Sequence, residues 1–240
     1  MSEMLQIQNL SISFGGIHAL SDVSFDVHKG EVLGLIGPNG SGKSTTVNIV
    51  SGIYTADSGK IIFDGKEVPS KLNDVARAKL GIGRTFQTPK PFSNMSVYDN
   101  VFAIALQKHS FKEAHERTRE ILDLTGLNKY AEMLSAKLPI EKRKWLDMAR
   151  ILVTDPKILM LDEVMAGLNH SEMDESVELV KRINKSGLTI LFIEHIMKAV
   201  VNLCERVVVL NQGKLLAQGE PVEVLRRKEV VEAYLGGANI

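Results

Sequence analysis

One short segment of this 240-residue chain has the residue types and the spacing to bind phosphate. Residues 37–44 read Gly-Pro-Asn-Gly-Ser-Gly-Lys-Ser and fit the pattern G-x-x-x-x-G-K-[ST], directly after an apolar run at 32–36. Glycines allow successive backbone N–H groups to turn toward an anion, and a following helix adds its positive N-terminal end. Lys43 would reach the β- and γ-phosphates, and the Ser44 hydroxyl would bind Mg²⁺. The segment therefore predicts a nucleoside triphosphate site.

Two acids at the end of a second apolar run supply another part of the same chemistry. Residues 158–161 are apolar and are followed by Asp162 and Glu163. In α/β sheets, ligands bind outside the carboxyl ends of the strands, so acids placed there lie in the ligand crevice. We expect Asp162 to reach the Mg²⁺ shell and Glu163 to face the γ-phosphate.

The elements that must position these residues alternate between strand and helix patterns. Period-two alternation at 5–10 and 23–27, and the apolar start of 61–66 before an Asp-Gly turn, predict strands. The continuous run at 32–36 suits a strand buried on both faces of a mainly parallel sheet.

The later part of the chain predicts further strands at 158–161 and 188–193. Between them a helix is expected from about 172 to 185, which Ser171 could cap and Gly187 could end. Alternation of this kind predicts right-handed βαβ units.

The middle of the chain has a different pattern. Apolar residues recur at three and four positions over about 98–106, 112–124 and 142–152, which predicts helices. We therefore expect an α/β fold of the P-loop NTPase class, with a mainly parallel core sheet, an N-terminal antiparallel β part and an inserted helical subdomain. The chain is interpreted as a single domain over 1–240, with its core at 1–87 and 153–240 and the helical subdomain at 88–152.

Composition limits the function. The chain has 29 Lys and Arg and 29 Asp and Glu, a formal net charge of zero, which argues against a protein that coats nucleic acid or an anionic membrane. Cys204 is the single cysteine, so no intrachain disulfide can form, and the first ten residues do not resemble a signal peptide. A reducing, cytosolic setting is expected, and no run approaches the roughly 18 apolar residues of a membrane-spanning helix.

Taken together, the motifs resemble those of the ATP-binding subunits of ABC transporters, over essentially the whole chain. Residues 37–45 match the family's Walker A loop, and Phe14 occupies the place of the aromatic that stacks on adenine. The resemblance implies ATP and Mg²⁺ as cofactors and makes the chain a transport ATPase. The nucleotide-binding residues that it implies are Phe14, Gly37, Pro38, Asn39, Gly40, Ser41, Gly42, Lys43, Ser44 and Thr45.

The resemblance also implies catalytic roles. Asp162 matches the Walker B aspartate, and Glu163 matches the general base that polarises the attacking water. Gln87, in the string Arg-Thr-Phe-Gln at 84–87, matches the Q-loop glutamine, and His195 resembles the switch histidine that touches the γ-phosphate. Residues 166–169 resemble the D-loop. The implied metal ligands are Ser44, Gln87 and Asp162.

Within the family the resemblance is strongest to ATPases of high-affinity branched-chain amino acid importers and of related urea and amide importers. It rests on residues 14–16, 83–87 and 95–101. It also rests on the C-terminal tail, from about 215 to 240, and above all on residues 233–237. A lipopolysaccharide-type exporter ATPase is a less favoured alternative because of the 84–87 string and the tail. A soluble ABC ATPase acting on DNA or ribosomes is disfavoured, since those relatives carry coiled-coil insertions or tandem ATPase units.

The chain departs from the family at one motif. The signature Leu-Ser-Gly-Gly-Gln should begin twelve residues before Arg150, where residues 138–142 read Leu-Pro-Ile-Glu-Lys. A nearer match in letters, at 134–136, lies four residues too early. Pro139 has no N–H to offer, although proline suits a first helical turn. Glu141 would add a negative charge near a phosphate unless a neighbouring basic residue offsets it.

This departure matters because members of the family work as dimers that sandwich two ATP molecules, each between one subunit's Walker A loop and the other's signature. We hypothesise a heterodimer with unequal sites, in which this chain's own Walker A site hydrolyses ATP and the reciprocal site is weak or silent. The alternative is a nucleotide-regulated subunit with weak or no hydrolysis, against which Glu163 and His195 argue.

The partners that the resemblance implies are membrane permease subunits, a second ATP-binding subunit in a hetero- or homodimer and, indirectly, a solute-binding protein. It implies no nucleic acid partner, and it places the chain peripherally on the cytoplasmic face of the inner (cell) membrane. Residues 91–98 lie where the family forms a groove for a coupling helix. The alternative for this segment is that Phe92, Met95 and Val97 merely pack the helical insert.

Overall fold

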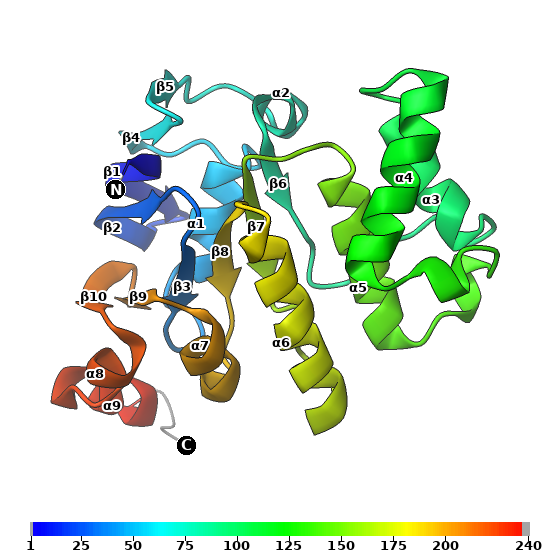
Figure 1. Ribbon diagram of the computed structural model, residues 1–240. Helices are drawn as coiled ribbons and strands as arrows, with labels where there is room; N and C mark the ends of the chain where they lie inside the picture. Colours follow the sequence, from blue (N-terminus) through cyan, green and yellow to red (C-terminus); the bar gives the residue numbers. More distant parts are fainter. Residues whose placement is uncertain (1, 237–240) are drawn as a thin grey trace.

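In the computed structural model, which describes residues 2–236, the strands form two sheets (Figure 1). The first has four antiparallel strands in the order β2-β1-β4-β5. The second has six strands in the order β10-β9-β3-β8-β7-β6, and all its pairings are parallel except that of β10 with β9. The predicted combination of a mainly parallel core sheet and an N-terminal antiparallel part is confirmed. The strands are β1 (Glu3–Phe14), β2 (Ile17–His28), β3 (Val32–Ile36), β4 (Ser58–Phe63), β5 (Lys66–Val68), β6 (Ile82–Arg84), β7 (Ile158–Asp162), β8 (Thr189–Ile193), β9 (Arg206–Asn211) and β10 (Lys214–Gly219).

The core sheet is covered on both faces, as the run at 32–36 predicts. Every residue of β3 is buried. Because successive side chains point to opposite faces of a strand, Leu33 and Leu35 join one apolar cluster while Val32 and Ile36 join the other. The first cluster packs α1 (Lys43–Val50) and the antiparallel sheet against the core sheet, and the second packs α6 (His170–Lys185) and α7 (Met197–Leu203) on its other face. Packing on both faces of the sheet therefore fixes the ends of the strands that the motifs follow.

Residues 97–152 are helical and lie to the right of the core in Figure 1, in green. The three predicted helices are confirmed within two residues at each end as α3 (Val97–Ala105), α4 (Phe111–Thr125) and α5 (Ile140–Leu152), with short 3₁₀ turns η1 (Asn128–Tyr130) and η2 (Ser135–Lys137) between the last two. Residues 88–152 remain our proposed bounds for this helical subdomain.

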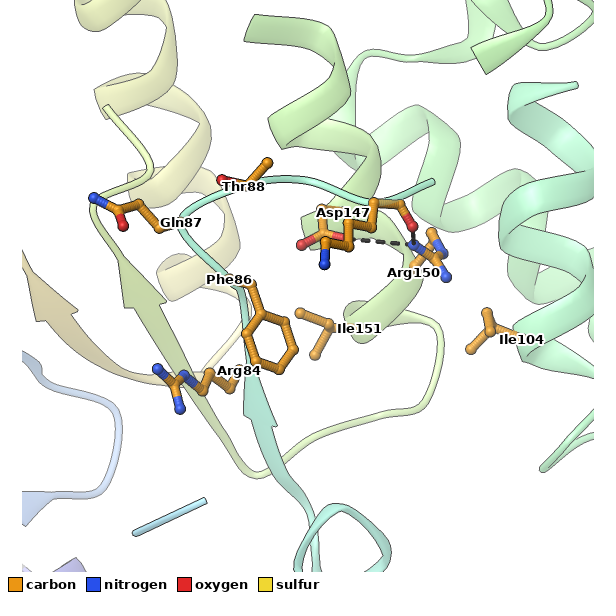
Figure 2. A pocket seen from close by; sticks show the side chains of 9 residues that line it. Arg84, Phe86, Gln87, Thr88, Ile104, Asp147, Arg150 and Ile151 are labelled. Atoms are coloured by element: carbon orange, nitrogen blue, oxygen red, sulfur yellow. Dashed lines mark hydrogen bonds and ion pairs between the residues drawn. The ribbon is translucent and has the colours of Figure 1, made fainter. Parts of the chain in front are cut away.

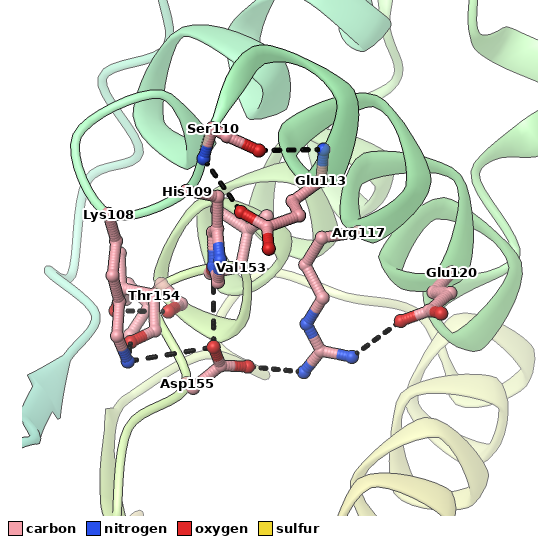
Figure 3. Close-up of polar contacts among 10 residues, drawn as sticks. Lys108, His109, Ser110, Glu113, Arg117, Glu120, Val153, Thr154 and Asp155 are labelled. Carbon is pink, nitrogen blue, oxygen red and sulfur yellow. Dashed lines mark hydrogen bonds and ion pairs between the residues drawn. The ribbon is translucent and has the colours of Figure 1, made fainter.

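An ion-pair cluster around Asp155 fastens the helical subdomain to the core (Figure 3). Asp155 lies just before β7, and its carboxylate accepts a hydrogen bond from Arg117 of α4 at 2.5 Å. His109 Nε2 and Lys108 Nζ approach the same carboxylate at 3.3 and 3.5 Å. Each of these half-exposed pairs contributes no more than about 1 kcal/mol. The cluster lies at the amino end of β7, the end opposite Asp162.

One predicted helix cap is wrong. Helix α6 begins at His170 and is capped by Asn169, not by Ser171. The Asn169 side chain accepts the N–H of Glu172 at 3.0 Å, and the Glu172 carboxylate accepts the N–H of Asn169 at 2.9 Å. This reciprocal pair satisfies two backbone donors at once, which a cap at Ser171 could not do. Gly187 ends the helix as predicted, with a φ of +93° and its N–H donating to Asn184.

No prediction covers strands β5, β6, β9 and β10, and none covers four of the helices. These helices are α2 (Asp74–Leu80), α7, α8 (Pro221–Leu225) and α9 (Lys228–Gly236). Helix α9 contains most of the tail string at 233–237, whose last residue lies outside the described part of the chain. Within residues 2–236, no helix combines the length and the hydropathy needed to span a bilayer.

Candidate active site

The loops that follow three parallel strands meet at one edge of the core sheet. Strand β3 pairs with β8, and β8 pairs with β7, all in parallel. The register places Ile193, the last residue of β8, beside both Leu35 of β3 and Asp162 of β7. The carboxyl ends of parallel strands share one edge, so the predicted phosphate loop, the two acids and the His195 loop are brought together.

The phosphate loop has a conformation that only glycine allows at its first position. Gly37 has a φ of +147°, and a Cβ there would lie 2.1 Å from the carbonyl oxygen of Leu210. Gly42 also has a positive φ, +107°, and caps α1, which begins at Lys43. Residues of this loop and of the start of α1 line a pocket of about 170 Å³, to which Glu163, at the end of β7, also contributes. The pocket is lined by Ala19, Asn39, Gly40, Ser41, Gly42, Lys43, Ser44, Thr45 and Glu163.

Lys43 lies folded against this loop. Its ammonium donates to the carbonyl oxygens of Gly37 at 2.7 Å and of Pro38 at 3.0 Å. Burial lowers the pKa of Lys43, while the negative charges of Glu163 and Asp162 act to raise it. The loop therefore holds a buried cation next to two carboxylates, which is the electrostatic setting that a bound polyphosphate and a divalent cation would share.

Glu163 has a strained backbone and a defined partner. Its φ is +50°, in the left-handed region that non-glycine residues seldom adopt, and its N–H donates to the carbonyl of Ile193 at 2.9 Å. Gln87 Nε2 donates to its carboxylate at 2.6 Å. Two residues 76 positions apart in the sequence thus meet at the phosphate pocket.

Arg84 is a site residue to which the sequence analysis gave no role. Its guanidinium donates to Asp162 Oδ2 at 2.9 Å, and each side chain is about one-tenth exposed. The other guanidinium nitrogen donates to Asn48 Oδ1 at 2.6 Å and Ser51 Oγ at 3.1 Å, both on or next to α1. Arg84 therefore fixes one carboxylate oxygen of Asp162 and ties β6, β7 and α1 together.

We expect Arg84→Met to lower the free energy of unfolding by about 3 to 5 kcal/mol, because it leaves the Asp162 carboxylate buried without its partner. Urea denaturation measures the change. The matched control is Arg117→Met, which breaks the partly exposed pairs with Asp155 and Glu120, each worth about 1 kcal/mol or less. Equal stability of the two variants would contradict the assigned strength of the Arg84 pair.

The donor set near the pocket fits a magnesium ion that takes most of its ligands from water and phosphate. Ser44 supplies a hydroxyl, Asp162 a carboxylate and Gln87 an amide oxygen, which are the hard oxygen ligands that Mg²⁺ prefers. The described residues contain no group of three or more His, Cys, Asp or Glu side chains arranged to bind a metal.

Six of the predicted site residues do not line the phosphate pocket. Gly37, Pro38 and Gln87 contact Lys43 or Glu163, which line it, and Asp162 directly precedes Glu163. The other two are Phe14 and His195. Phe14 ends β1 and is 44% exposed, with its ring edge against Tyr54 at a centroid distance of 5.2 Å. His195 is half-exposed, and its Nδ1 lies 3.9 Å from Glu194. Both side chains are exposed, and their roles toward a nucleotide stay predictions.

The altered signature forms the start of α5. Pro139 is its N-cap, and Glu141 and Lys142 are both buried. Lys142 Nζ lies 2.9 Å from Glu141 and 3.1 Å from Glu175 of α6, and it sits 3.3 Å from the centre of the Trp145 ring. Burial raises the pKa of Glu141, and Lys142 acts to lower it. Lys142 is thus the basic residue that offsets Glu141.

The nearer match in letters at 134–136 is excluded as a phosphate contact. Ser135 is fully buried, and its hydroxyl donates to the carbonyl oxygen of Phe92 at 2.8 Å. This serine therefore has a structural role inside the helical subdomain.

A groove of about 690 Å³ separates the end of β6 from the helical subdomain, as Figure 2 shows. Phe86 and Phe92 are exposed at or beside it, and the ring of Phe92 faces Arg150 at 4.6 Å. Val97, in contrast, is fully buried in the helical subdomain. Val97 therefore packs the helical subdomain, and a role of the segment 91–98 in receiving a coupling helix stays a prediction. The lining residues are Arg84, Phe86, Gln87, Thr88, Lys90, Ile104, Asp147, Arg150 and Ile151.

Comparisons with known proteins give a consistent result. The family described as "ABC transporter" matches residues 20–166. The chain is 36% identical to the probable branched-chain amino acid transport ATP-binding protein LivG of Archaeoglobus fulgidus, over 98% of this chain and 96% of that protein. It is also 36% identical to LivG of Escherichia coli, the high-affinity branched-chain amino acid transport ATP-binding protein, over 98% of each. The lipopolysaccharide export system ATP-binding protein LptB of Escherichia coli is 34% identical over 97% of each.

Solved structures agree with the sequence matches. The ADP conformation of MJ1267, an ATP-binding cassette of an ABC transporter, superposes with a TM-score of 0.89 at 31% identity, covering 98% of this chain and 100% of that one. CbiO1 of Clostridium perfringens, part of the ABC transporter complex cbiONQ, gives a TM-score of 0.87 at 33% identity, covering 97% and 94%.

Proposed function

Because the chain belongs to the ABC transporter family as an ATP-binding subunit, we propose that it is the Mg²⁺-dependent ATPase that powers an importer of branched-chain amino acids or a related small polar solute. The observation that carries the hydrolytic part is the contact between Gln87 and Glu163 at the phosphate pocket, at 2.6 Å. The solute follows from the relatives named for branched-chain amino acid transport. It does not follow from this chain's own residues.

The proposed reaction is in-line attack of water on the γ-phosphate. Glu163 accepts a proton from that water. Gln87, which is hydrogen-bonded to Glu163, orients the water. Lys43 leaves the loop carbonyls and neutralises charge on the β- and γ-phosphates. His195 contacts the γ-phosphate, and Phe14 stacks on the adenine.

Ser44, Asp162 and Gln87 would hold Mg²⁺ through oxygen atoms, and the bound cation would neutralise charge on the phosphates. Arg84 donates a hydrogen bond to Oδ2 of Asp162. It thereby leaves Oδ1 for the metal shell.

The groove in Figure 2 is our proposed contact for a permease subunit on the cytoplasmic face of the cell membrane. Its walls come from β6 on one side and from α3 and α5 on the other, so an occupant would touch both parts of the chain. Arg84 and Gln87 line the groove and also contact Asp162 and Glu163. A solute-binding protein would act on the permeases and would not touch this chain.

The solute proposal is tested by uptake of radiolabelled leucine in cells that lack this chain. We expect the wild-type chain to restore uptake and Lys43→Ala to leave it absent, with unlabelled valine and isoleucine competing. Urea and short amides are tested as alternative substrates. Restored lipopolysaccharide export without any change in uptake would favour the exporter alternative and overturn the importer proposal.

The altered signature leads us to propose, in addition, a heterodimer with unequal sites. Pro139 offers no N–H, and the Lys142 ammonium is engaged by Glu141, Glu175 and the Trp145 ring. A site completed by this segment lacks the serine hydroxyl of the family's signature and the N–H at position 139, and the engaged Lys142 ammonium does not replace them. This chain's own Walker A loop would instead be completed by a full signature on the partner.

A further inference from the structure

Two buried charged side chains without a role in the proposed reaction hold the loop that carries Glu163. Glu194 follows β8 and has no exposed surface. Its carboxylate accepts the N–H of Met165 at 2.8 Å and the N–H of His195 at 3.4 Å. Lys144 lies on α5, and its ammonium donates to the carbonyl oxygen of Ala166. The two side chains therefore attach to consecutive residues of one loop, from two different elements.

The loop needs such attachments because its conformation is strained. A non-glycine residue in the left-handed region costs about 1 to 3 kcal/mol and persists only where its surroundings determine it. Glu163 has a φ of +50°. Its own N–H is bonded to Ile193, and its carbonyl accepts the N–H of Ala166 at 3.2 Å. Glu194 and Lys144 bind Met165 and Ala166, two and three residues further on, so they add to the bonds that keep this conformation.

The two side chains are affected by burial, and Lys144 also by the charge of Glu194. Burial raises the pKa of Glu194 and lowers the pKa of Lys144, and the charge of Glu194 acts to raise that of Lys144. Glu163 and His195 are the other charged or titratable groups that act on this pair. Neither side chain lines the phosphate pocket.

We propose that Glu194 and Lys144 are positioning residues that keep Glu163 aimed at the bound nucleotide. Through Lys144 the orientation of the Glu163 side chain depends on α5, the helix that starts at the altered signature. This inference rests on the proposed role of Glu163 in hydrolysis.

The test compares Glu194→Leu, Glu194→Gln and Lys144→Met in the complex with the partner subunits. Since small misplacements of a reacting group cost up to about 10²-fold, we expect Glu194→Leu and Lys144→Met to lower kcat by roughly 10- to 100-fold. The KM for ATP and the affinity for a fluorescent ATP analogue should stay within about twofold, because binding groups are untouched. Glu194→Gln keeps an acceptor for the Met165 N–H and should recover most of kcat.

Asn184→Leu is the matched control. Its amide donates to Gly30 and Leu188 at the opposite end of β8, so it removes two comparable hydrogen bonds far from the pocket. We expect it to lower stability and leave kcat unchanged. Wild-type kcat in Glu194→Leu, or an equal loss in Asn184→Leu, would overturn the inference.

Hydrogen exchange separates this inference from the proposed function. Backbone amides of 163–168 should exchange faster in Glu194→Leu and Lys144→Met than in the wild type, with no change in Asn184→Leu. Unchanged exchange would overturn the tethering role even where activity is lost. A wild-type complex that binds ATP without hydrolysing it would instead overturn the proposed function, while the exchange data would still decide whether the tether exists.

Discussion

Glu163→Gln is expected to bind ATP with wild-type affinity and to hydrolyse it roughly 10² to 10⁴ times more slowly. Glutamine has nearly the same shape as glutamate, and its amide oxygen can still accept the hydrogen bond from Gln87. It cannot accept a proton from water, so the general-base contribution is lost. Removing a negative charge beside the phosphate loop also gives no reason for weaker ATP binding. Single-turnover hydrolysis and titration with a fluorescent ATP analogue measure the two quantities separately.

The control for this change is Glu178→Gln, the same substitution on an exposed position of α6, where Glu178 pairs with Lys181. It should leave hydrolysis unchanged. A wild-type rate in Glu163→Gln would show that another group acts as the base. A loss of ATP binding would show that Glu163 serves the fold of the pocket, in which case its backbone strain rather than its carboxylate would be the feature to examine.

The sequence was sufficient to predict the fold and the meeting of the two motifs. Residues 32–36 and 158–161 are continuous apolar runs, and each is directly followed by polar residues with a defined chemistry. A run of that kind can be a strand only if both faces are covered, which requires a parallel sheet with neighbours on each side. Parallel strands then place their following loops at one edge. The predicted ABC-type fold and family are confirmed by the comparisons.

Contacts made by single side chains across the sheet could not be predicted in the same way. Arg84 and Asp162 are 78 residues apart, and neither periodicity nor motif spacing shows that they pair. Glu194 follows an apolar strand, where a glutamate is expected to face solvent, yet it is fully buried because the Met165 loop folds over it. Such pairings depend on how two loops pack, which local patterns do not describe.

The cap of α6, in contrast, has a signal that could have identified it. Asn169 and Glu172 are three residues apart at the start of the helical pattern, which is the spacing of a capping box. Three positions after Ser171 lies Asp174, whose side chain is shorter than the Glu or Gln side chain of a capping box. The spacing was a better guide than residue type alone.

In the proposed heterodimer, blocking the two ATP sites is expected to have very different effects. Glu163→Gln in this chain should remove nearly all hydrolysis by the complex. The equivalent change of the partner's general base should cost little, because the site it serves is completed by residues 138–142 of this chain. Loss of a single preorganised donor to developing charge costs about 10² to 10³ in rate. The site completed by this chain should therefore be slower than the other by at least roughly that factor.

The physical basis is that residues 139–142 offer a phosphate fewer hydrogen-bond donors than the family's signature does. Pro139 has no N–H, Ile140 is half-exposed with a side chain where close backbone approach is wanted, and Glu141 is buried against Lys142. Restoring Ser, Gly, Gly and Gln at 139–142 should raise hydrolysis by this chain alone, whereas Lys142→Gln by itself should not, because the proline and the acid remain. Steady-state ATP hydrolysis is measured for the lone chain, for the chain mixed with its partner and for these variants. The rates decide whether the two sites are unequal. Full, cooperative hydrolysis by the unaltered lone chain would show that residues 138–142 complete a working site, and the two sites would then be equal.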